Sequence, residues 1–358
     1  MIAQLLKKLN KKTLPNKYFF SPEWIVLGVN NVCNLHCKMC DVGTKNLESN
    51  FAQNLVGSHP INMPLELIKK IIDQTAEFYP NAKLGYAFTE PLVYPHLEES
   101  LTYAKQKGIS TSITTNALTL KQKASFLAKN NTEVFISLDG PQDIHNDIRG
   151  HKKSFQKAVE GIEQLLEIKP NAKISIFCVI TEWNIGYLQD FLNFFKNYPL
   201  QQVGFMHTNF TPQHVADFHN ILWGKHYHAT ASNMDEININ NFNLDKLWNE
   251  IDLINQLSYQ FPVTFSPEIT SKEKLNEFYN KPQQIIGKSC NDVFTNIMVK
   301  SDGSVIPSHG RCYNLTLGNL YTENLKSIWN GSILKKLRTD LKTSNGLFPA
   351  CSRCCSAL

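Results

Sequence analysis

The sequence predicts an α/β fold built on a parallel β-sheet. Two observations support this prediction. From residue 24 to about residue 207, short runs rich in β-branched residues alternate with longer amphipathic runs. The short runs are also apolar on both faces, which is typical of parallel strands covered by helices on either side. We therefore expect six βα units in a sheet that is open or curled toward a barrel.

The six expected strands are short and apolar. They are 24–30, 82–89, 110–116, 133–138, 172–181 and 203–207. The helices expected between them are 64–78, 96–108, 119–130, 154–168 and 184–197. Pro64 suits a first helical turn, and Gly108 suits the end of a helix.

The alternation stops near residue 240. We expect a helix over 243–261, a connecting stretch with three prolines over 262–288, a β-hairpin over 294–308 and a helix over 325–342. The expected segments are an N-terminal extension (1–23), the sheet domain (24–240), a connecting helix and linker (241–284) and a cysteine-rich module (285–358). A small module with little core usually needs a metal to hold it together.

Composition excludes several classes of protein. The 358 residues carry a net charge of only +5, and no long apolar stretch predicts a transmembrane helix. The first twelve residues are too short and too charged for a signal peptide, so we expect a cytoplasmic protein. A basic run of Lys7, Lys8, Lys11 and Lys12 is interpreted as a solvated first helix rather than a nucleic-acid or membrane site.

Nine cysteines in a reducing compartment indicate metal binding or catalysis rather than disulfides. Cys33, Cys37 and Cys40 are spaced C-x3-C-x2-C, and the next cysteine is Cys178. Three thiolates can hold three irons of a four-iron cube and leave the fourth iron open to another ligand. The alternative is a zinc site that recruits His36 or Asp41 as its fourth ligand.

Short polar motifs stand at the expected strand ends. They are the three-cysteine loop, TEP (89–91), TTN (114–116), SLDG (137–140), TEWN (181–184) and His207. Chemistry in parallel α/β sheets sits at the C-terminal ends of the strands. We therefore expect all of these motifs to face one pocket.

The cysteine spacing after the first strand resembles the signature of radical S-adenosylmethionine (SAM) enzymes, and the resemblance covers roughly residues 24–207. It implies a partial (β/α)6 TIM-like barrel in which Cys33, Cys37 and Cys40 hold a 4Fe–4S cluster. SAM would fill the open position of that cluster. Reductive cleavage of SAM would then give a 5′-deoxyadenosyl radical that abstracts hydrogen from the substrate.

Further motifs carry the same resemblance. Phe88 and Thr89 stand where the family usually has two glycines before Glu90 and Pro91, and residues 137–150 are similar to a stretch of the peptide- and small-molecule-modifying branch. By this resemblance Ser137 and Asp139 approach the SAM ribose, and Arg149 meets the methionine carboxylate. The implied SAM-binding residues are Phe88, Thr89, Glu90, Asn116, Ser137, Asp139, Arg149 and Thr181. The alternative is a strand-to-loop turn at Ser137 and Asp139, with Arg149 paired to Asp147 at the surface.

A second cysteine group lies at the C-terminal end. Cys290, Cys312, Cys351 and Cys354 are enough to close a metal site, and a four-cysteine zinc knot is one interpretation. The neighbouring DGSVIP, LGNL and LKSIW segments resemble the SPASM extension or its shorter form, Twitch, which implies an auxiliary 4Fe–4S cluster. The family often has a cysteine where this chain has Ser308, and we expect Cys312 to replace it.

Two cysteines are left over as candidate hydrogen-atom donors. Cys355 follows the expected ligand Cys354 directly, and its alternative roles are to replace Cys354 or merely to neighbour a ligand. Cys178 lies in the fifth expected strand, where a buried hydrophobic role is the alternative.

From these features we expect a radical SAM enzyme that abstracts hydrogen from an unactivated carbon of a small molecule, in an oxidation or epimerisation. The short stretch before the first strand favours a small molecule over a peptide. The alternatives are an enzyme that modifies ribosomal peptides and a maturase that acts on a partner protein. Two non-enzymes are also considered: a zinc-binding scaffold and a two-cluster electron-transfer protein. The expected partner is an electron donor such as flavodoxin or ferredoxin, and a histidine-rich run (205–228) is a candidate cover for the pocket.

Overall fold

The computed structural model of the protein describes residues 2–57 and 59–357. One ten-stranded sheet organises this part of the chain, in the order β10-β9-β8-β1-β2-β3-β4-β5-β6-β7. The strands are β1 (Trp24–Leu27), β2 (Lys83–Tyr86), β3 (Thr111–Thr115), β4 (Glu133–Ser137), β5 (Ile174–Ile180), β6 (Gln202–His207), β7 (Val263–Ser266), β8 (Asn296–Val299), β9 (Ser304–Pro307) and β10 (Gly318–Asn319).

Helices surround the sheet. They are α1 (Ile2–Thr13), α2 (Asn50–Leu55), α3 (Leu65–Phe78), α4 (Leu97–Gln106), α5 (Leu120–Asn130), α6 (Gln142–Arg149), α7 (Ser154–Ile168), α8 (Leu188–Phe195), α9 (Gln213–Trp223), α10 (Leu244–Gln256), α11 (Lys272–Asn280), α12 (Leu325–Trp329) and α13 (Ser332–Thr343).

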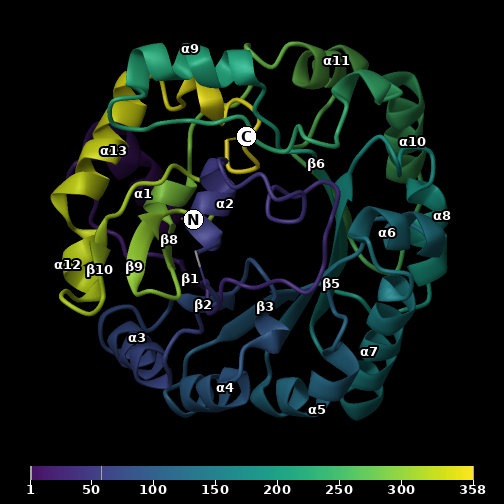
Figure 1. The fold of residues 1–358 in the computed structure, drawn as a ribbon, viewed down its shortest axis with the longest axis horizontal. Helices are drawn as coiled ribbons and strands as arrows, with labels where there is room; N and C mark the ends of the chain where they lie inside the picture. Colours follow the sequence, from purple (N-terminus) through teal and green to yellow (C-terminus); the bar gives the residue numbers. More distant parts are fainter. Residues whose placement is uncertain (1, 58, 358) are drawn as a thin grey trace.

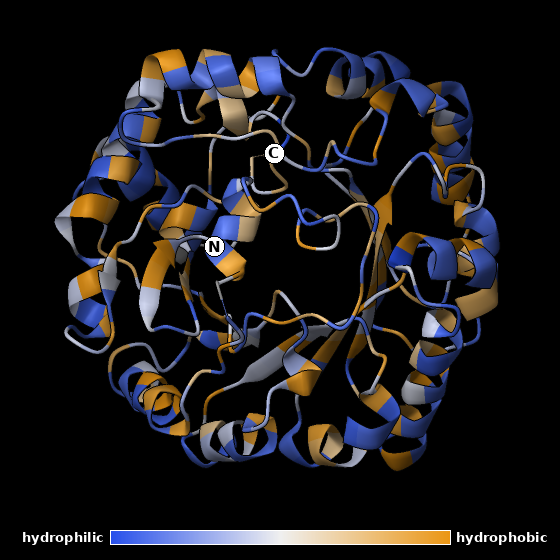
Figure 2. Cartoon of the chain, in the orientation of Figure 1, coloured by the Kyte–Doolittle hydropathy of each residue, from blue (hydrophilic) through white to orange (hydrophobic). Residues whose placement is uncertain are grey.

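The predicted partial (β/α)6 barrel is confirmed. Strands β1 to β6 pair in sequential order, and every pairing is parallel. Most helices form an outer ring, while the short helix α2 and the C-terminal segment lie inside it (Figure 1). The strands and the inner faces of the ring helices are mainly hydrophobic, whereas the outer faces carry more hydrophilic residues (Figure 2). The core therefore lies between sheet and ring, as expected for strands covered by helices.

The C-terminal hairpin extends the barrel sheet. Strands β8 and β9 pair antiparallel around the predicted turn, where Gly303 has a φ of 79°, which glycine adopts readily. Strand β8 also pairs in parallel with β1, with Trp24 opposite Asn296. The hairpin thus covers the β1 edge of the barrel, so the boundary proposed at residue 285 separates segments that share one sheet.

The structure corrects one prediction in the second half of the chain. Residues 262–288 are not merely a connecting stretch, because they contain β7, which pairs in parallel with β6, and helix α11. Strand β7 is only four residues long and is half-buried to exposed along its length. Pro262 and Pro267 flank β7, so the sequence around it shows strand-breaking residues rather than an apolar run. No helix in the described residues is long and apolar enough to cross a membrane.

Candidate functional site

The three-cysteine loop follows β1 and opens onto a cavity of about 340 Å³. Cys33, Cys37 and Cys40 all line this cavity, which we call the main cavity. A Cβ atom at Gly43 would lie 2.4 Å from the carbonyl oxygen of Cys37, so the loop folds this tightly only with glycine there. Burial raises the pKa of Cys37 to about 12, and the nearby Cys40 and Cys33 raise it further while Arg149 opposes them. Burial also raises the pKa of Cys33, so a bound cation would supply the positive charge that favours these two thiolates.

The loop after β2 lines the same cavity with backbone in an unusual conformation. Phe88 and Thr89 have φ angles of 65° and 47°, in the left-handed region that favours glycine. The Thr89 hydroxyl donates to Asn30 Oδ1 over 2.6 Å, which helps to hold the turn. A β-branched residue in this region is strained, and such strain concentrates at functional sites. Phe88 and Thr89 stand where the family that the sequence resembles has two glycines. The backbone therefore takes the left-handed conformation at the same two positions in this chain.

Glu90 holds this loop but does not line the main cavity. Its carboxylate accepts hydrogen bonds from the backbone N–H of Asn116 (2.8 Å), the hydroxyl of Thr115 (2.7 Å) and the backbone N–H of Leu92 (2.9 Å). Burial raises the pKa of Glu90, and these three hydrogen bonds oppose that rise. Its carboxylate therefore joins the ends of β2 and β3, and Asn116 and Thr115 reach the cavity from there.

Ser137 and Arg149 line the main cavity, whereas Asp139 lies fully buried behind it. The Arg149 Nε atom donates to Asp139 Oδ2 over 2.5 Å, and the Asp139 Oδ1 atom accepts from the backbone N–H of Val179. The surface partner Asp147 instead pairs with Lys38 at 2.8 Å, which removes the predicted alternative of an Arg149–Asp147 pair. Burial lowers the pKa of Arg149, but the Asp139 carboxylate and Cys37 outweigh burial and raise it. Arg149 is thus a fixed cation at the cavity wall.

Four predicted site residues do not line the main cavity. They are Glu90, Asp139, Thr181 and Cys178, and all four are buried. Both oxygens of Asp139 are engaged, so the geometry offers none to a ribose. The Cys178 thiol contacts Asn184 Nδ2 at 3.7 Å, within the protein interior. Its environment matches the buried hydrophobic alternative better than a donor that reaches a substrate.

The second cysteine group converges on a separate, narrower cavity. Cys290, Cys312, Cys351 and Cys354 line it, and we call it the auxiliary cavity. Burial raises the pKa of Cys290 to about 12 and also raises that of Cys351. Cys290 and Cys351 further raise the pKa of Cys312 by their charge. This set of four half-buried thiols around one cavity fits a thiolate-bound metal centre, whose cation would offset the repulsion between the thiolates.

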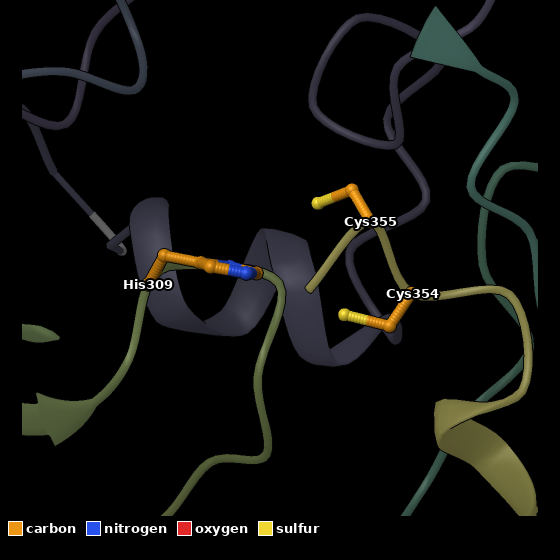
Figure 3. A group of neighbouring side chains, drawn as sticks. All are labelled: His309, Cys354 and Cys355. Atoms are coloured by element: carbon orange, nitrogen blue, oxygen red, sulfur yellow. The ribbon is translucent and has the colours of Figure 1, made fainter. Parts of the chain in front are cut away.

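Cys354 lines the auxiliary cavity, and its neighbour Cys355 lines the main cavity. Cys355 comes from the opposite end of the chain to Cys33, Cys37 and Cys40. Among the described residues, one group of candidate ligands lies within 4.8 Å of one another, namely His309, Cys354 and Cys355 (Figure 3). The Nε2 atom of His309 lies 3.1 Å from the Ser356 hydroxyl, and Asp292 lies 3.5 Å away. His309 is therefore an additional candidate ligand beside Ser308, the position where the sequence lacks an expected cysteine.

The two cavities share a wall. Phe51, Asn209 and Arg311 line both of them. The Arg311 guanidinium stacks 4.2 Å from the Phe51 ring centroid, and its Nη1 atom is buried without a hydrogen-bond partner. Sequence reasoning missed Arg311 and Phe51, because neither belongs to a motif and only the fold brings them together.

One histidine of the 205–228 run reaches the main cavity. His207 lines it, and its Nδ1 atom lies 2.8 Å from the Tyr279 hydroxyl. Burial lowers the pKa of His207 to about 3, so its imidazole is neutral at physiological pH. His219 is instead buried under α9, where it stacks on Tyr313. The run therefore contributes His207 and Asn209 to the cavity wall, rather than a histidine-rich cover.

Comparison with known protein families decides between the interpretations. A model of the radical SAM superfamily matches residues 28–195, and a model of the SPASM iron–sulfur cluster-binding domain matches residues 290–355. The chain contains a radical SAM domain and a SPASM domain. The predicted cofactors follow from these domains: SAM, the 4Fe–4S cluster that binds it, and auxiliary iron–sulfur binding.

Curated relatives of the radical SAM domain include maturases. The serine-type anaerobic sulfatase-maturating enzyme of Bacteroides thetaiotaomicron is 30% identical over 201 residues, which cover 52% of this chain and 46% of that protein. The mycofactocin maturase MftC of Mycobacterium ulcerans is 31% identical over 165 residues, 44% of this chain and 40% of that protein. The chain thus aligns with about half the length of the curated relatives it matches.

Solved structures share the fold. Streptococcus suis SuiB bound to its precursor peptide SuiA matches with a TM-score of 0.64 and 16% identity, covering 94% of this chain and 71% of that one. The structure of anSMEcpe with AdoMet and the Cp18Cys peptide matches with a TM-score of 0.60 and 17% identity, covering 93% and 87%. Both likenesses concern the fold alone.

Proposed function

We propose that this radical SAM protein is an enzyme that modifies a peptide or a protein segment, starting with hydrogen abstraction. The small-molecule substrate expected from the sequence is less well supported, because the named relatives above are maturases. The observation that carries the proposal is the main cavity. Its wall combines the three-cysteine loop with polar groups from the C-terminal ends of β2 to β6, and no Asp or Glu is among the described residues that line it.

In this proposal Cys33, Cys37 and Cys40 hold the 4Fe–4S cluster, and the cavity volume is within the range of small-molecule sites. When bound, the cluster and SAM supply a one-electron reductant and a 5′-deoxyadenosyl radical that takes hydrogen from carbon. The left-handed backbone at Phe88 and Thr89 presents main-chain polar groups to the methionine end of SAM. Asn116 and Ser137 approach its adenosyl part from the ends of β3 and β4.

Arg149 binds the SAM carboxylate in this account, and Asp139 is a positioning residue rather than a ribose ligand. The buried ion pair fixes the guanidinium at the cavity wall, because Asp139 accepts from its Nε atom and leaves other N–H groups free to donate. Thr181 and Glu90 support the loops behind the wall from buried positions.

The auxiliary cavity supports a second 4Fe–4S cluster held by Cys290, Cys312, Cys351 and Cys354. Cys355 then remains free to face the main cavity as the hydrogen-atom donor or as a contact to the substrate. Arg311 stands between the two cavities, where its unpartnered Nη1 atom is available to a carbonyl or carboxylate oxygen of the substrate. A peptide offers such oxygens at every residue, which agrees with the proposed substrate class.

A zinc scaffold is the rival that the cysteines alone allowed. Tetrahedral zinc gathers thiolates to about 3.8 Å from one another. The three N-terminal thiols do not form a group within 4.8 Å among the described residues. The polar wall built from six strand ends would also have no purpose in a scaffold.

The proposed substrate class is tested with labelled peptides. Short reading frames beside the gene are made as synthetic peptides with deuterated residues, and each is incubated anaerobically with the reconstituted protein, SAM and dithionite. Deuterium in the released 5′-deoxyadenosine from a peptide is the expected result. A Cys33→Ala/Cys37→Ala/Cys40→Ala variant is the control and should release none. Transfer from deuterated sugars but from none of the peptides would overturn the peptide assignment while leaving hydrogen abstraction intact.

A further inference from the structure

A basic groove lies between helix α1 and the C-terminal module. Its volume is about 790 Å³, and seven cationic side chains line it: Lys7, Lys8, Lys11, Lys12, Lys288, Arg338 and Lys342. No Asp or Glu is among the described residues of its lining. At the edge of the groove Glu23 pairs with Lys7 at 2.8 Å, and the Asp292 carboxylate acts on the charge of Lys11. The sequence alone indicated a solvated helix for this lysine run. In the structure the run forms one wall of a concentrated positive surface.

The positive charge of the groove is held by the protein framework. Arg338 is only 1% exposed, stacks 4.3 Å from the Trp329 ring centroid and donates to the Val293 carbonyl over 2.9 Å. Its buried Nη2 atom has no hydrogen-bond partner. Lys11 donates to the Ser289 hydroxyl over 3.3 Å, next to Cys290. Arg338 therefore supplies positive charge from behind the groove wall, while the exposed Lys8, Lys12 and Lys288 present charge at the surface.

The groove reaches the auxiliary cavity. Cys290 and Ala357 line both of them, so a proposed cluster ligand forms part of the groove floor. The auxiliary cavity in turn shares Phe51, Asn209 and Arg311 with the main cavity. Three cavities that share walls thus lie in sequence from the surface to the three-cysteine loop.

The groove lies at the opposite end of the sheet from the main cavity. Phe294 and Thr295 line it, and they directly precede β8, which runs parallel to β1. The main cavity instead opens at the C-terminal ends of the strands, and the two share no lining residue. A substrate that reacts in the main cavity therefore has no direct route through the groove.

We propose that this groove docks an acidic one-electron carrier protein of the flavodoxin or ferredoxin class, which delivers its electron through the auxiliary site. The inference rests on the function proposed above. The auxiliary cluster that Cys290, Cys312, Cys351 and Cys354 would hold would accept the one electron that the reduced carrier gives up, with no bond formed or broken. Charge complementarity favours an acidic carrier, since clustered positive charge steers and orients a negative partner. The exposed Leu5, Leu6 and Leu9 on the same helix add the apolar contact typical of protein interfaces.

The test compares two charge-reversal variants of the full, reconstituted chain. The groove variant is Lys8→Glu/Lys12→Glu/Lys288→Glu, and all three residues are exposed. The matched control is Lys157→Glu/Lys173→Glu/Lys196→Glu, which makes the same change of net charge at exposed positions on and beside α7, β5 and α8. Binding of an oxidised flavodoxin is measured by calorimetry at several salt concentrations. SAM cleavage is then driven either by reduced flavodoxin or by dithionite.

The wild type and the control should bind flavodoxin with an affinity that falls as salt rises. The groove variant should bind about tenfold or more weakly and lose most of that salt dependence. Cleavage driven by flavodoxin should fall with binding, whereas cleavage driven by dithionite should stay at the wild-type rate. Equal binding by the groove and control variants would overturn the proposal, as would a wild-type chain that binds a polyglutamate peptide but not flavodoxin. Failure of the SAM-cleaving activity on which the proposed function depends is distinct, because it abolishes SAM cleavage with dithionite in every variant.

Discussion

The buried ion pair behind the main cavity allows a quantitative prediction. Replacing Asp139 by Asn keeps the shape of the side chain but leaves the Arg149 guanidinium without its counter-charge. The Asp139 side chain is 0% exposed and that of Arg149 is 10% exposed, so water compensates little. Removing one partner of a buried pair costs about 3 to 5 kcal/mol. Because Arg149 keeps a contact with the cavity, we expect the lower end, about 3 kcal/mol.

The assay is urea unfolding of the metal-free, reduced chain, with the free energy of unfolding compared between variants. Asp147→Asn is the matched control on the same helix α6, because its pair with Lys38 is exposed and should contribute less than about 1 kcal/mol. The double variant Asp139→Asn/Arg149→Met should recover part of the loss, since it removes the unpaired charge. The SAM affinity of the reconstituted Asp139→Asn variant should also fall. An Asp139→Asn chain as stable as Asp147→Asn would refute the reasoning.

Three further predictions concern single positions. Thr89→Gly should be more stable than Thr89→Ala by about 1 kcal/mol in urea unfolding. Both variants lose the hydroxyl, and only glycine relieves the strain of the left-handed backbone. An alanine variant of equal stability would show that the turn carries no strain. Cys354→Ala should lower the reconstituted iron content by about four atoms per chain, whereas Cys355→Ala should leave it unchanged, since only Cys354 lines the auxiliary cavity. Loss of iron from the Cys355→Ala variant would make Cys355 a ligand. The pKa of His207 is lowered to about 3, so its neutral form stabilises the fold at pH 7.5 and this contribution is lost as pH falls below the unfolded-state value of about 6.5. Between pH 7.5 and 5.5 the metal-free wild type should therefore lose about 1 kcal/mol more than His207→Asn, and parallel pH profiles would contradict the burial of this imidazole.

Much of the fold was predictable because its signals are local. Alternating apolar and amphipathic runs gave the six parallel strands, and the turn at Asp302 and Gly303 gave the β8–β9 hairpin. Strand β7 was missed because it has four partly exposed residues and no apolar run. The pairing of β8 with β1 was also beyond local signals, since it joins residues far apart in the chain.

The site was predictable where a motif lies at a strand end. The three-cysteine loop, Phe88, Thr89 and Ser137 follow or end strands and do line one cavity. Asp139 shows what motif reasoning leaves out, because this residue lies behind the cavity wall and its carboxylate pairs with Arg149. The position of Arg311 and the grouping of His309 with Cys354 and Cys355 depend on packing between distant segments, which no spacing encodes.

The central claim is that Cys33, Cys37 and Cys40 hold a SAM-cleaving cluster that is separate from the C-terminal site. The most direct test is iron content and SAM cleavage after anaerobic reconstitution, in the native chain and in the Cys33→Ala/Cys37→Ala/Cys40→Ala variant. The account predicts about eight irons in the native chain and about four in the variant, with 5′-deoxyadenosine released only by the native chain. A native chain that binds zinc and no iron, or a variant that still cleaves SAM, would contradict it.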